Sequence, residues 1–175
     1  MAVVCFRMEF DVVQGDIATQ SADVLVNAAG TSLQMGSGVA GALRRGAGGP
    51  INEKAVSKGP VDLGEVAVTG AYDLDAEHVV HAAAMPHYGD GEATPESIRA
   101  ATENTLAAAD DLGAESVVVP ALGCGVAGFD LTEGARIICE TIDGYDPGKL
   151  EDVRVIAYSD AEFETIREVA AAVRG

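Results

Sequence analysis

The segment Val117-Val-Val-Pro-Ala-Leu-Gly-Cys-Gly-Val-Ala-Gly-Phe-Asp130 joins a short apolar run to a loop rich in glycine. The apolar run is typical of a strand that is buried on both faces of a sheet. The glycines permit positive φ angles and let backbone N–H groups approach a ligand closely. A second segment has the same order, with Val24–Ala28 as the strand and glycines from Gly30 to Gly41. We call residues 29–41 the first glycine loop and residues 122–130 the second glycine loop, and we expect both at the carboxyl ends of strands in an α/β sheet.

Short valine-rich stretches along the rest of the chain predict further strands. The predicted strands are Met8–Gln14, Val24–Ala28, Glu65–Thr69, His78–Ala83, Val117–Ala121 and Val153–Tyr158. Helix start signals lie between them, at Thr94-Pro95, Asp130–Glu133 and Ser159–Glu162. This alternation predicts one α/β domain over residues 1–175, with loops at Gly46–Gly49 and Met85–Thr94. We expect residues 1–7 to form an extra edge strand or to precede an alternative start at Met8.

The charge of the chain is strongly negative. It has 28 acidic and 11 basic residues among 175, a formal net charge of −17, while 48% of its residues are hydrophobic. Such a charge disfavours nucleic-acid backbones and anionic membranes as partners, and no apolar run approaches the roughly 20 residues of a membrane helix. Self-repulsion is screened at molar salt, where the Debye length is about 3 Å. We therefore expect a cytoplasmic protein of a high-salt cell, with an acidic mesophilic protein as the alternative.

Cysteine and histidine residues do not predict a metal site. Cys5, Cys124 and Cys139 form no C-x-x-C pair, as expected in a reducing compartment. His78 and His81 are three residues apart in a predicted strand, so their side chains point to opposite faces. Zinc requires several ligands that converge on one point.

Both glycine loops suit an anion. Neither contains a Lys or Arg residue, and each leads to a predicted helix N-terminus. Successive backbone N–H groups together with a helix dipole bind an anion without any cationic side chain. No Gly-Lys-Ser/Thr sequence follows, which excludes a Walker A loop, and the first strand opens no G-x-G-x-x-G fingerprint. The alternative is that the glycines form turns without a ligand.

Five motifs in order make the chain similar to the macro domain family, whose members are α/β/α modules that bind ADP-ribose. The motifs are Val12–Ile17 (Val-Val-Gln-Gly-Asp-Ile), Val26–Ala29, Gly36–Gly41, His81–Ala83 and Pro120–Phe129. The likeness extends from about Met8 to the final helix. It implies a three-layer fold with a central mixed sheet of about six or seven strands. It also implies ADP-ribose as a ligand, and no cofactor.

The resemblance implies a role for each motif. Asp16 accepts a hydrogen bond from the exocyclic amine of adenine, beside the backbone of Ile17, and Tyr158 stacks on the adenine ring. The backbone of both glycine loops wraps the diphosphate, and Phe129 flanks the distal ribose. The implied ligand contacts are Asp16, Ile17, Asn27, Ala28, Gly36, Ser37, Gly38, Val39, Ala40, Gly123, Cys124, Gly125, Val126, Ala127, Gly128, Phe129 and Tyr158. The alternatives are that Asp16 only caps a turn and that Tyr158 belongs to the core or the rim.

Two positions depart from the family pattern and leave two functions open. Many members have asparagine where this chain has Gly30, and hydrolytic members often have aspartate where it has Ala40. Asn27 and His87 are then the candidate catalytic residues, with loop bracing and a solvated position as their respective alternatives; Cys124 is expected to have a loop role.

The chain either binds ADP-ribose, free or as a terminal mono-ADP-ribosyl group, or hydrolyses ADP-ribosyl esters, O-acetyl-ADP-ribose or ADP-ribose 1″-phosphate. Substrate-assisted hydrolysis, with a diphosphate oxygen and a trapped water, stays open as a route that needs no side-chain base. Poly-ADP-ribose is disfavoured because its phosphates would meet the acidic surface.

Overall fold

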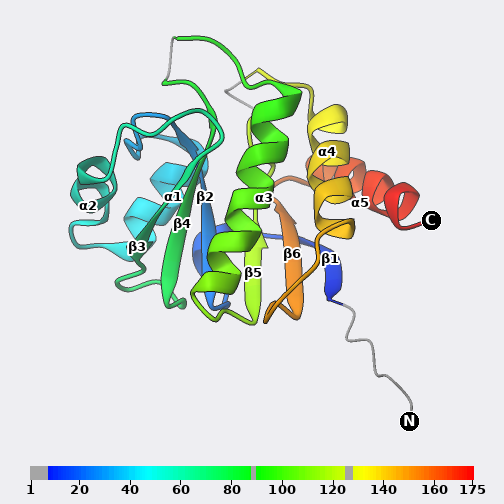
Figure 1. Ribbon diagram of the computed structural model, residues 1–175, viewed down its shortest axis with the longest axis horizontal. Coiled ribbons are helices and arrows are strands. Elements are labelled where there is room, and N and C mark those ends of the chain that lie inside the picture. The colour runs from blue at the N-terminus through cyan, green and yellow to red at the C-terminus, as the bar shows by residue number, and fades with distance from the viewer. Residues whose placement is uncertain (1–7, 88–89, 125–127) are drawn as a thin grey trace.

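Six strands form one mixed sheet in this computed structural model, in the order β1-β6-β5-β2-β4-β3 (Figure 1). The structure describes residues 8–87, 90–124 and 128–175. The strands are Glu9–Gln14 (β1), Val24–Gly30 (β2), Val66–Gly70 (β3), His78–Met85 (β4), Ser116–Val119 (β5) and Asp152–Ala157 (β6). Neighbouring strands are parallel except β3 and β4. Each predicted strand is confirmed with ends that differ by no more than about two residues, the usual uncertainty of such boundaries.

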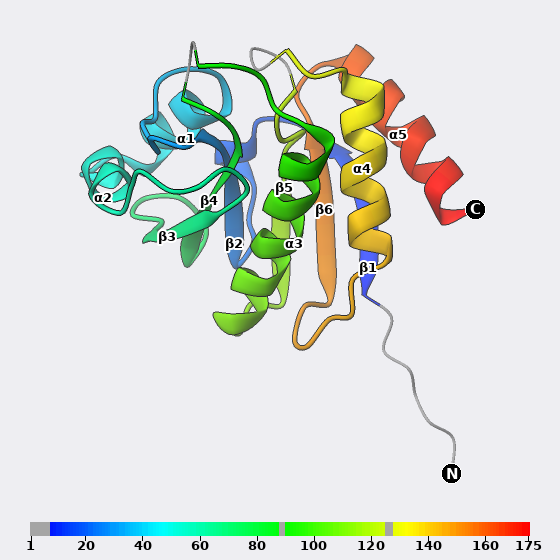
Figure 2. The same ribbon diagram turned by 45° about the horizontal axis from the view of Figure 1, so that its top comes forward.

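Helices cover both faces of this sheet (Figures 1 and 2). One apolar layer of the core lies under α3 (Pro95–Asp111), α4 (Leu131–Asp143) and α5 (Asp160–Arg174). The other lies under a 3-10 turn, η1 (Ile17–Thr19), and the helices α1 (Gly38–Ala47) and α2 (Ile51–Ser57). Successive residues of β2 alternate between the two layers, as Val24 and Leu25 do, because side chains alternate along a strand. Within the described ranges, no helix is long and apolar enough to cross a bilayer.

Side-chain caps fix the predicted helix starts. Thr94 and Ser97 form a reciprocal capping box at α3. The Asp130 carboxylate accepts from the backbone N–H of Glu133 at 3.0 Å, and Ser159 Oγ accepts from that of Glu162 at 3.2 Å. These caps satisfy N–H groups that have no partner inside the helix. The three predicted N-termini are thus confirmed.

The region between β2 and β3 differs from the prediction. The expected loop at Gly46–Gly49 is wrong in its first half, because α1 continues to Ala47, which is buried against the sheet. Helix α2 was not predicted. It has seven residues, and it buries only Ile51 and Ala55, which are four residues apart and so share one face. A stripe of two residues is too short a periodic signal to identify a helix.

Strand β2 occupies a special position in the sheet. It pairs with β4 along its whole length, but with β5 only through Val24–Val117 and Leu25–Val118. Beyond these pairs β2 and β5 form no ladder. The two glycine loops follow these two neighbouring strands, so the fold places both loops at the same edge of the sheet.

Candidate functional site

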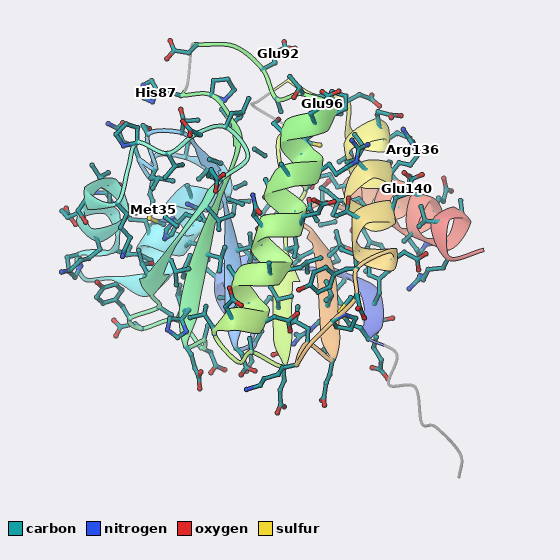
Figure 3. The ribbon with its side chains drawn as sticks, in the orientation of Figure 1. Met35, His87, Glu92, Glu96, Arg136 and Glu140 are labelled. Atoms are coloured by element: carbon teal, nitrogen blue, oxygen red, sulfur yellow. The ribbon has the colours of Figure 1, made fainter. Side chains whose placement is uncertain are left out.

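The predicted site residues gather at the edge where the parallel strands end. Asp16 follows β1, Gly30 ends β2, His87 follows β4, Gly123 follows β5 and Tyr158 follows β6. Because these strands are parallel, their carboxyl ends lie along one edge. Figure 3 shows the His87 side chain at this edge. The site is therefore built from segments that are far apart in the sequence.

The first glycine loop is open at Gly36 and Gly38, although a β-carbon at Gly41 would lie only 2.9 Å from the Gly36 carbonyl oxygen. A β-carbon placed at Gly36 or Gly38 would have no neighbour within 4 Å, and Gly38 has a positive φ of 63°. Ser37 occupies the N-cap position of α1, yet its side chain makes no cap bond. The first N–H groups of α1 are thus left for another acceptor, and a helix N-terminus favours an anion there. Val39 is half-buried, and Ala40 is buried in the core.

The second glycine loop is tightly packed where the structure describes it. A β-carbon at Gly123 would lie 2.7 Å from Cβ of Ala93 and 3.0 Å from Ile98, and the φ of Gly123 is 76°. Cys124 and Phe129 form a β-bridge across the loop. Gly128 has a φ of 80°, and its β-carbon would lie 3.0 Å from Oε1 of Glu92. The predicted contacts Gly125, Val126 and Ala127 lie outside the described residues.

The Cys124 thiol is unsuited to nucleophilic attack. Burial and, to a lesser degree, the carboxylates of Asp130 and Glu162 raise its pKa to about 11. Since the thiolate is the reactive form, this cysteine stays protonated and inert at neutral pH. The geometry favours the expected loop role.

The residues predicted to contact adenine lie at the ends of the outer strands β1 and β6. One carboxylate oxygen of Asp16 accepts from the backbone N–H of Ala18 at 2.9 Å, so Asp16 does cap the turn η1. The side chain of Ile17 is buried, which leaves only its backbone for a ligand. The ring of Tyr158 is 76% exposed. The alternative that Tyr158 belongs to the core is therefore wrong, and its ring is free to stack on a ligand.

A buried polar network connects the strands β2, β4 and β3. Nδ2 of Asn27 donates to Nδ1 of His81 at 3.0 Å, and Nε2 of His81 lies 2.9 Å from Oγ1 of Thr69. Because the Thr69 hydroxyl donates to the Gly70 carbonyl, its oxygen accepts the Nε2–H of a neutral imidazole. Burial lowers the pKa of His81 to about 4, which keeps the ring neutral.

This network favours a bracing role for Asn27. The Asn27 side chain is fully buried between β2 and β4, and its Oδ1 has no donor among the described residues. Ala28, the next residue, is half-buried. Both ring nitrogens of His81 are engaged within the protein, so this histidine is not free to bind a metal. No three His, Cys, Asp or Glu side chains converge as a ligand set in the part of the chain that the structure describes.

His87 is held at the end of β2. Its backbone N–H donates to Oγ1 of Thr31 at 3.1 Å, and its Nδ1 lies 2.8 Å from Oγ of Ser32. The alternative of a freely solvated histidine does not fit these contacts. Sequence reasoning missed Thr31 and Ser32 as partners, although two hydroxyl residues directly after a buried strand are a usable signal.

Comparison with known proteins identifies the fold. A family model described as "Macro domain" matches residues 26–138 of the chain. The chain belongs to the macro domain family. A macro domain-containing protein of Xanthomonas campestris is 33% identical over 173 residues, which are 94% of this chain and 96% of that protein. An uncharacterized protein of Mycobacterium tuberculosis is 38% identical over 154 residues, or 88% of this chain. This macro domain spans only 42% of the length of the mycobacterial relative.

Solved macrodomains have the same architecture. The macrodomain of Oceanobacillus iheyensis, crystallised with ADP, has a TM-score of 0.81 and 25% identity and covers 93% of this chain and 90% of its own. The macrodomain of Trypanosoma brucei in complex with ADP-ribose has a TM-score of 0.81 and 25% identity and covers 90% of this chain and 67% of its own. The predicted family and the three-layer fold with a mixed sheet are confirmed.

The two departures of this macro domain from its family pattern have structural explanations. A β-carbon at Gly30 would lie 3.0 Å from the backbone oxygen of Pro86 and 3.5 Å from Cα of His87. A side chain at position 30 would thus crowd the segment after β4, which would have to shift by a few tenths of an ångström. Ala40 is buried in the apolar layer under α1, where an ionised carboxylate would be costly.

Proposed function

We propose that this macro domain binds ADP-ribose, either free or as the terminal mono-ADP-ribosyl group of another molecule. The observation that carries the proposal is the open first glycine loop at the uncapped N-terminus of α1. An anion held by backbone N–H groups needs no cationic side chain. Such a site suits a diphosphate even in a protein with a net charge of −17.

In the proposed pose, the two ends of the ligand contact residues that are accessible to it. The second carboxylate oxygen of Asp16 accepts a hydrogen bond from the exocyclic amine of adenine, and the exposed Tyr158 stacks on the base. The backbone of residues 36–40 and of the second glycine loop surrounds the diphosphate. Phe129, which is half-buried against the core, flanks the distal ribose.

Titration calorimetry with ADP-ribose tests this proposal directly. We expect one molecule to bind per chain, and we expect AMP to bind more weakly because it lacks the second phosphate and the distal ribose. Tyr158→Ala should weaken binding by about 1–3 kcal/mol without changing stability, because the ring is exposed. Absence of ADP-ribose binding by the folded wild type at millimolar ligand would refute the proposal.

A second candidate function, hydrolysis at the distal ribose, is favoured by the contact between His87 and Ser32. We infer that His87 takes a proton from an attacking water. Among the described residues, it is the only histidine whose side chain is hydrogen-bonded to the loop after β2, and Ser32 holds its ring in place. The substrates proposed are an ADP-ribosyl ester, O-acetyl-ADP-ribose or ADP-ribose 1″-phosphate. A general base contributes about 10²–10⁴-fold to such a step.

Turnover assays on these three substrates separate the two functions. In the hydrolase case, His87→Gln should lower kcat by at least tenfold and remove one limb of the pH–rate profile, while ADP-ribose affinity is retained. Ser32→Ala should have a smaller effect in the same direction. Binding without turnover of any of the three substrates would rule out the hydrolase function.

The cellular setting proposed is a cytoplasm of high salt. The support is the surplus of carboxylates that have no cationic partner. Among the described residues, ion pairs involve only Arg136, Arg154 and Arg167. Screening of the remaining carboxylates should raise stability as KCl increases. Melting curves from low to multimolar KCl test this, and a melting temperature that does not rise would favour an acidic mesophilic protein.

A further inference from the structure

One stretch of the chain reverses its charge. Between Asp23 and Asp62 lie four of the 11 basic residues and only one of the 28 acidic residues, Glu53. The basic residues are Arg44, Arg45, Lys54 and Lys58, and all four are exposed. They lie in α1, in α2 and at the end of α2, two helices that lie side by side on one face of the sheet (Figures 1 and 2). We call these four residues the α1–α2 basic patch.

The patch has no acidic partner within the described residues. Elsewhere, Arg136 on α4 pairs with Glu133 and Glu140, and Arg167 on α5 pairs with Glu164. Figure 3 labels Arg136 and Glu140 on α4. No carboxylate of the described ranges lies within 4 Å of a patch cation. In a protein with 28 acidic residues, this separation leaves four positive charges available to another molecule.

A groove joins the patch to the first glycine loop. It has a volume of about 330 Å³, and its lining includes Gly36, Arg44, Asn52, Val56 and one carboxylate, Glu53. Of the four patch cations only Arg44 lines the groove itself, and Lys54 and Lys58 lie beside it in α2 and at its end. Its floor is held rigidly, since Oδ1 of Asn52 accepts from the backbone N–H of Met35 at 2.8 Å and the Arg44 guanidinium donates to the Met35 carbonyl at 3.1 Å. Met35 is labelled in Figure 3. Because Gly36 lines the groove and also belongs to the proposed ligand site, a group attached to the ligand can continue into the groove.

We propose that this groove and the α1–α2 basic patch bind the acidic polypeptide segment to which the ADP-ribosyl group is attached. The proposal rests on the proposed function. The carboxylates of such a segment complement the lysines and arginines, and the partly exposed Val56 offers an apolar contact. The patch is confined to two short helices, so it matches a short segment. A long polyanion such as nucleic acid would extend onto the acidic remainder of the surface.

The proposal is tested with two peptides, each of which carries one ADP-ribosyl group through the same non-hydrolysable linkage. In one peptide the modified residue is flanked by Asp and Glu, and in the other by Ser and Gly. At 0.1 M KCl, we expect the acidic peptide to bind about tenfold more tightly, as for two or three exposed ion pairs, and this preference should shrink as KCl rises. Lys54→Glu/Lys58→Glu should abolish the preference and leave the affinity for free ADP-ribose unchanged.

The matched control is Lys149→Glu/Arg167→Glu, which makes the same change in charge away from α1 and α2. It should keep the preference for the acidic peptide. Equal affinity for the two peptides, an equal loss in the control variant, or equally effective competition by an oligonucleotide would overturn the docking proposal. Failure of the proposed function is distinguishable, because free ADP-ribose would then not bind to the wild type.

Discussion

Gly36 of the first glycine loop and Gly123 of the second have opposite surroundings, although the two loop sequences look alike. In the second loop, Gly123 is required by the fold, because a β-carbon there would collide with Ala93 and the backbone is left-handed. In the first loop, Gly36 has empty space around it. A glycine whose neighbours leave no room affects stability, whereas a glycine with an ordinary φ angle beside empty space affects what enters that space. The comparison therefore separates loop residues that build the site from those that keep it open.

Gly123→Ala should give the largest effect and would show that the second loop is constrained by packing. A positive φ costs an L-residue about 1–2 kcal/mol, and a contact of 2.7 Å forces the neighbours to move. We expect the free energy of unfolding to fall by about 3 kcal/mol in urea titrations. A loss below about 0.5 kcal/mol would contradict the packing argument.

Acid should destabilise the folded protein through His81, whose side chain connects β4 to β2 and β3. The folded-state pKa of His81 is about 4, below the ordinary value of 6.5. The unfolded state thus binds the proton first as pH falls, so stability present above pH 6.5 is lost progressively towards pH 4. At pH 5 this loss is about 2 kcal/mol.

The contribution of His81 is the difference between the stability–pH curves of wild type and His81→Gln, measured by urea unfolding from pH 7.5 to 4.5. Parallel curves for wild type and His81→Gln would show that His81 does not make the folded state acid-sensitive.

Gly36→Val should change binding rather than stability. Since nothing lies within 4 Å of its β-carbon position, the free energy of unfolding should stay within about 0.5 kcal/mol of wild type. The same side chain would occupy space proposed for the diphosphate, so ADP-ribose affinity should drop about tenfold, or about 1.4 kcal/mol, in calorimetry. Unchanged affinity would place the phosphates elsewhere.

Gly38→Ala should have the smallest effect of these changes and measures the cost of a positive φ angle without crowding. Gly38 shares the open surroundings of Gly36 but has a φ of 63°, so only backbone strain opposes a side chain. We expect a stability loss of about 1 kcal/mol, clearly less than for Gly123→Ala. Losses of equal size at the two positions would mean that packing around Gly123 adds nothing to the cost of its φ angle.

The fold could be predicted from the sequence where the signals are local. Valine-rich runs identify the six strands, and the cap residues Thr94, Asp130 and Ser159 identify three helix starts. Helix α2 was missed because its only buried residues are Ile51 and Ala55. Parallel order alone explains why the ends of β2 and β5 lie at one edge of the sheet, so the general place of the candidate site could also be predicted.

The contacts that give this site its individual character could not be predicted. His87 meets Ser32 across 55 residues, and Asn27 meets His81 across 54. Such pairs depend on the register between β2 and β4, which no local pattern specifies. The close approach of Pro86 to Gly30, which bears on a departure from the family pattern, could likewise not be predicted. It depends on a contact between two segments that are distant in the sequence.

The short ladder between β2 and β5 has a consequence for how this protein can change over generations. Each of the two strands is anchored on its far side, β2 by seven registered pairs with β4 and β5 by four with β6. Only two pairs connect them to each other. An insertion or deletion in either glycine loop therefore leaves the anchoring ladders in register. The two halves of the ligand edge are free to diverge separately, so a lineage can exchange what it recognises while inheriting the same sheet.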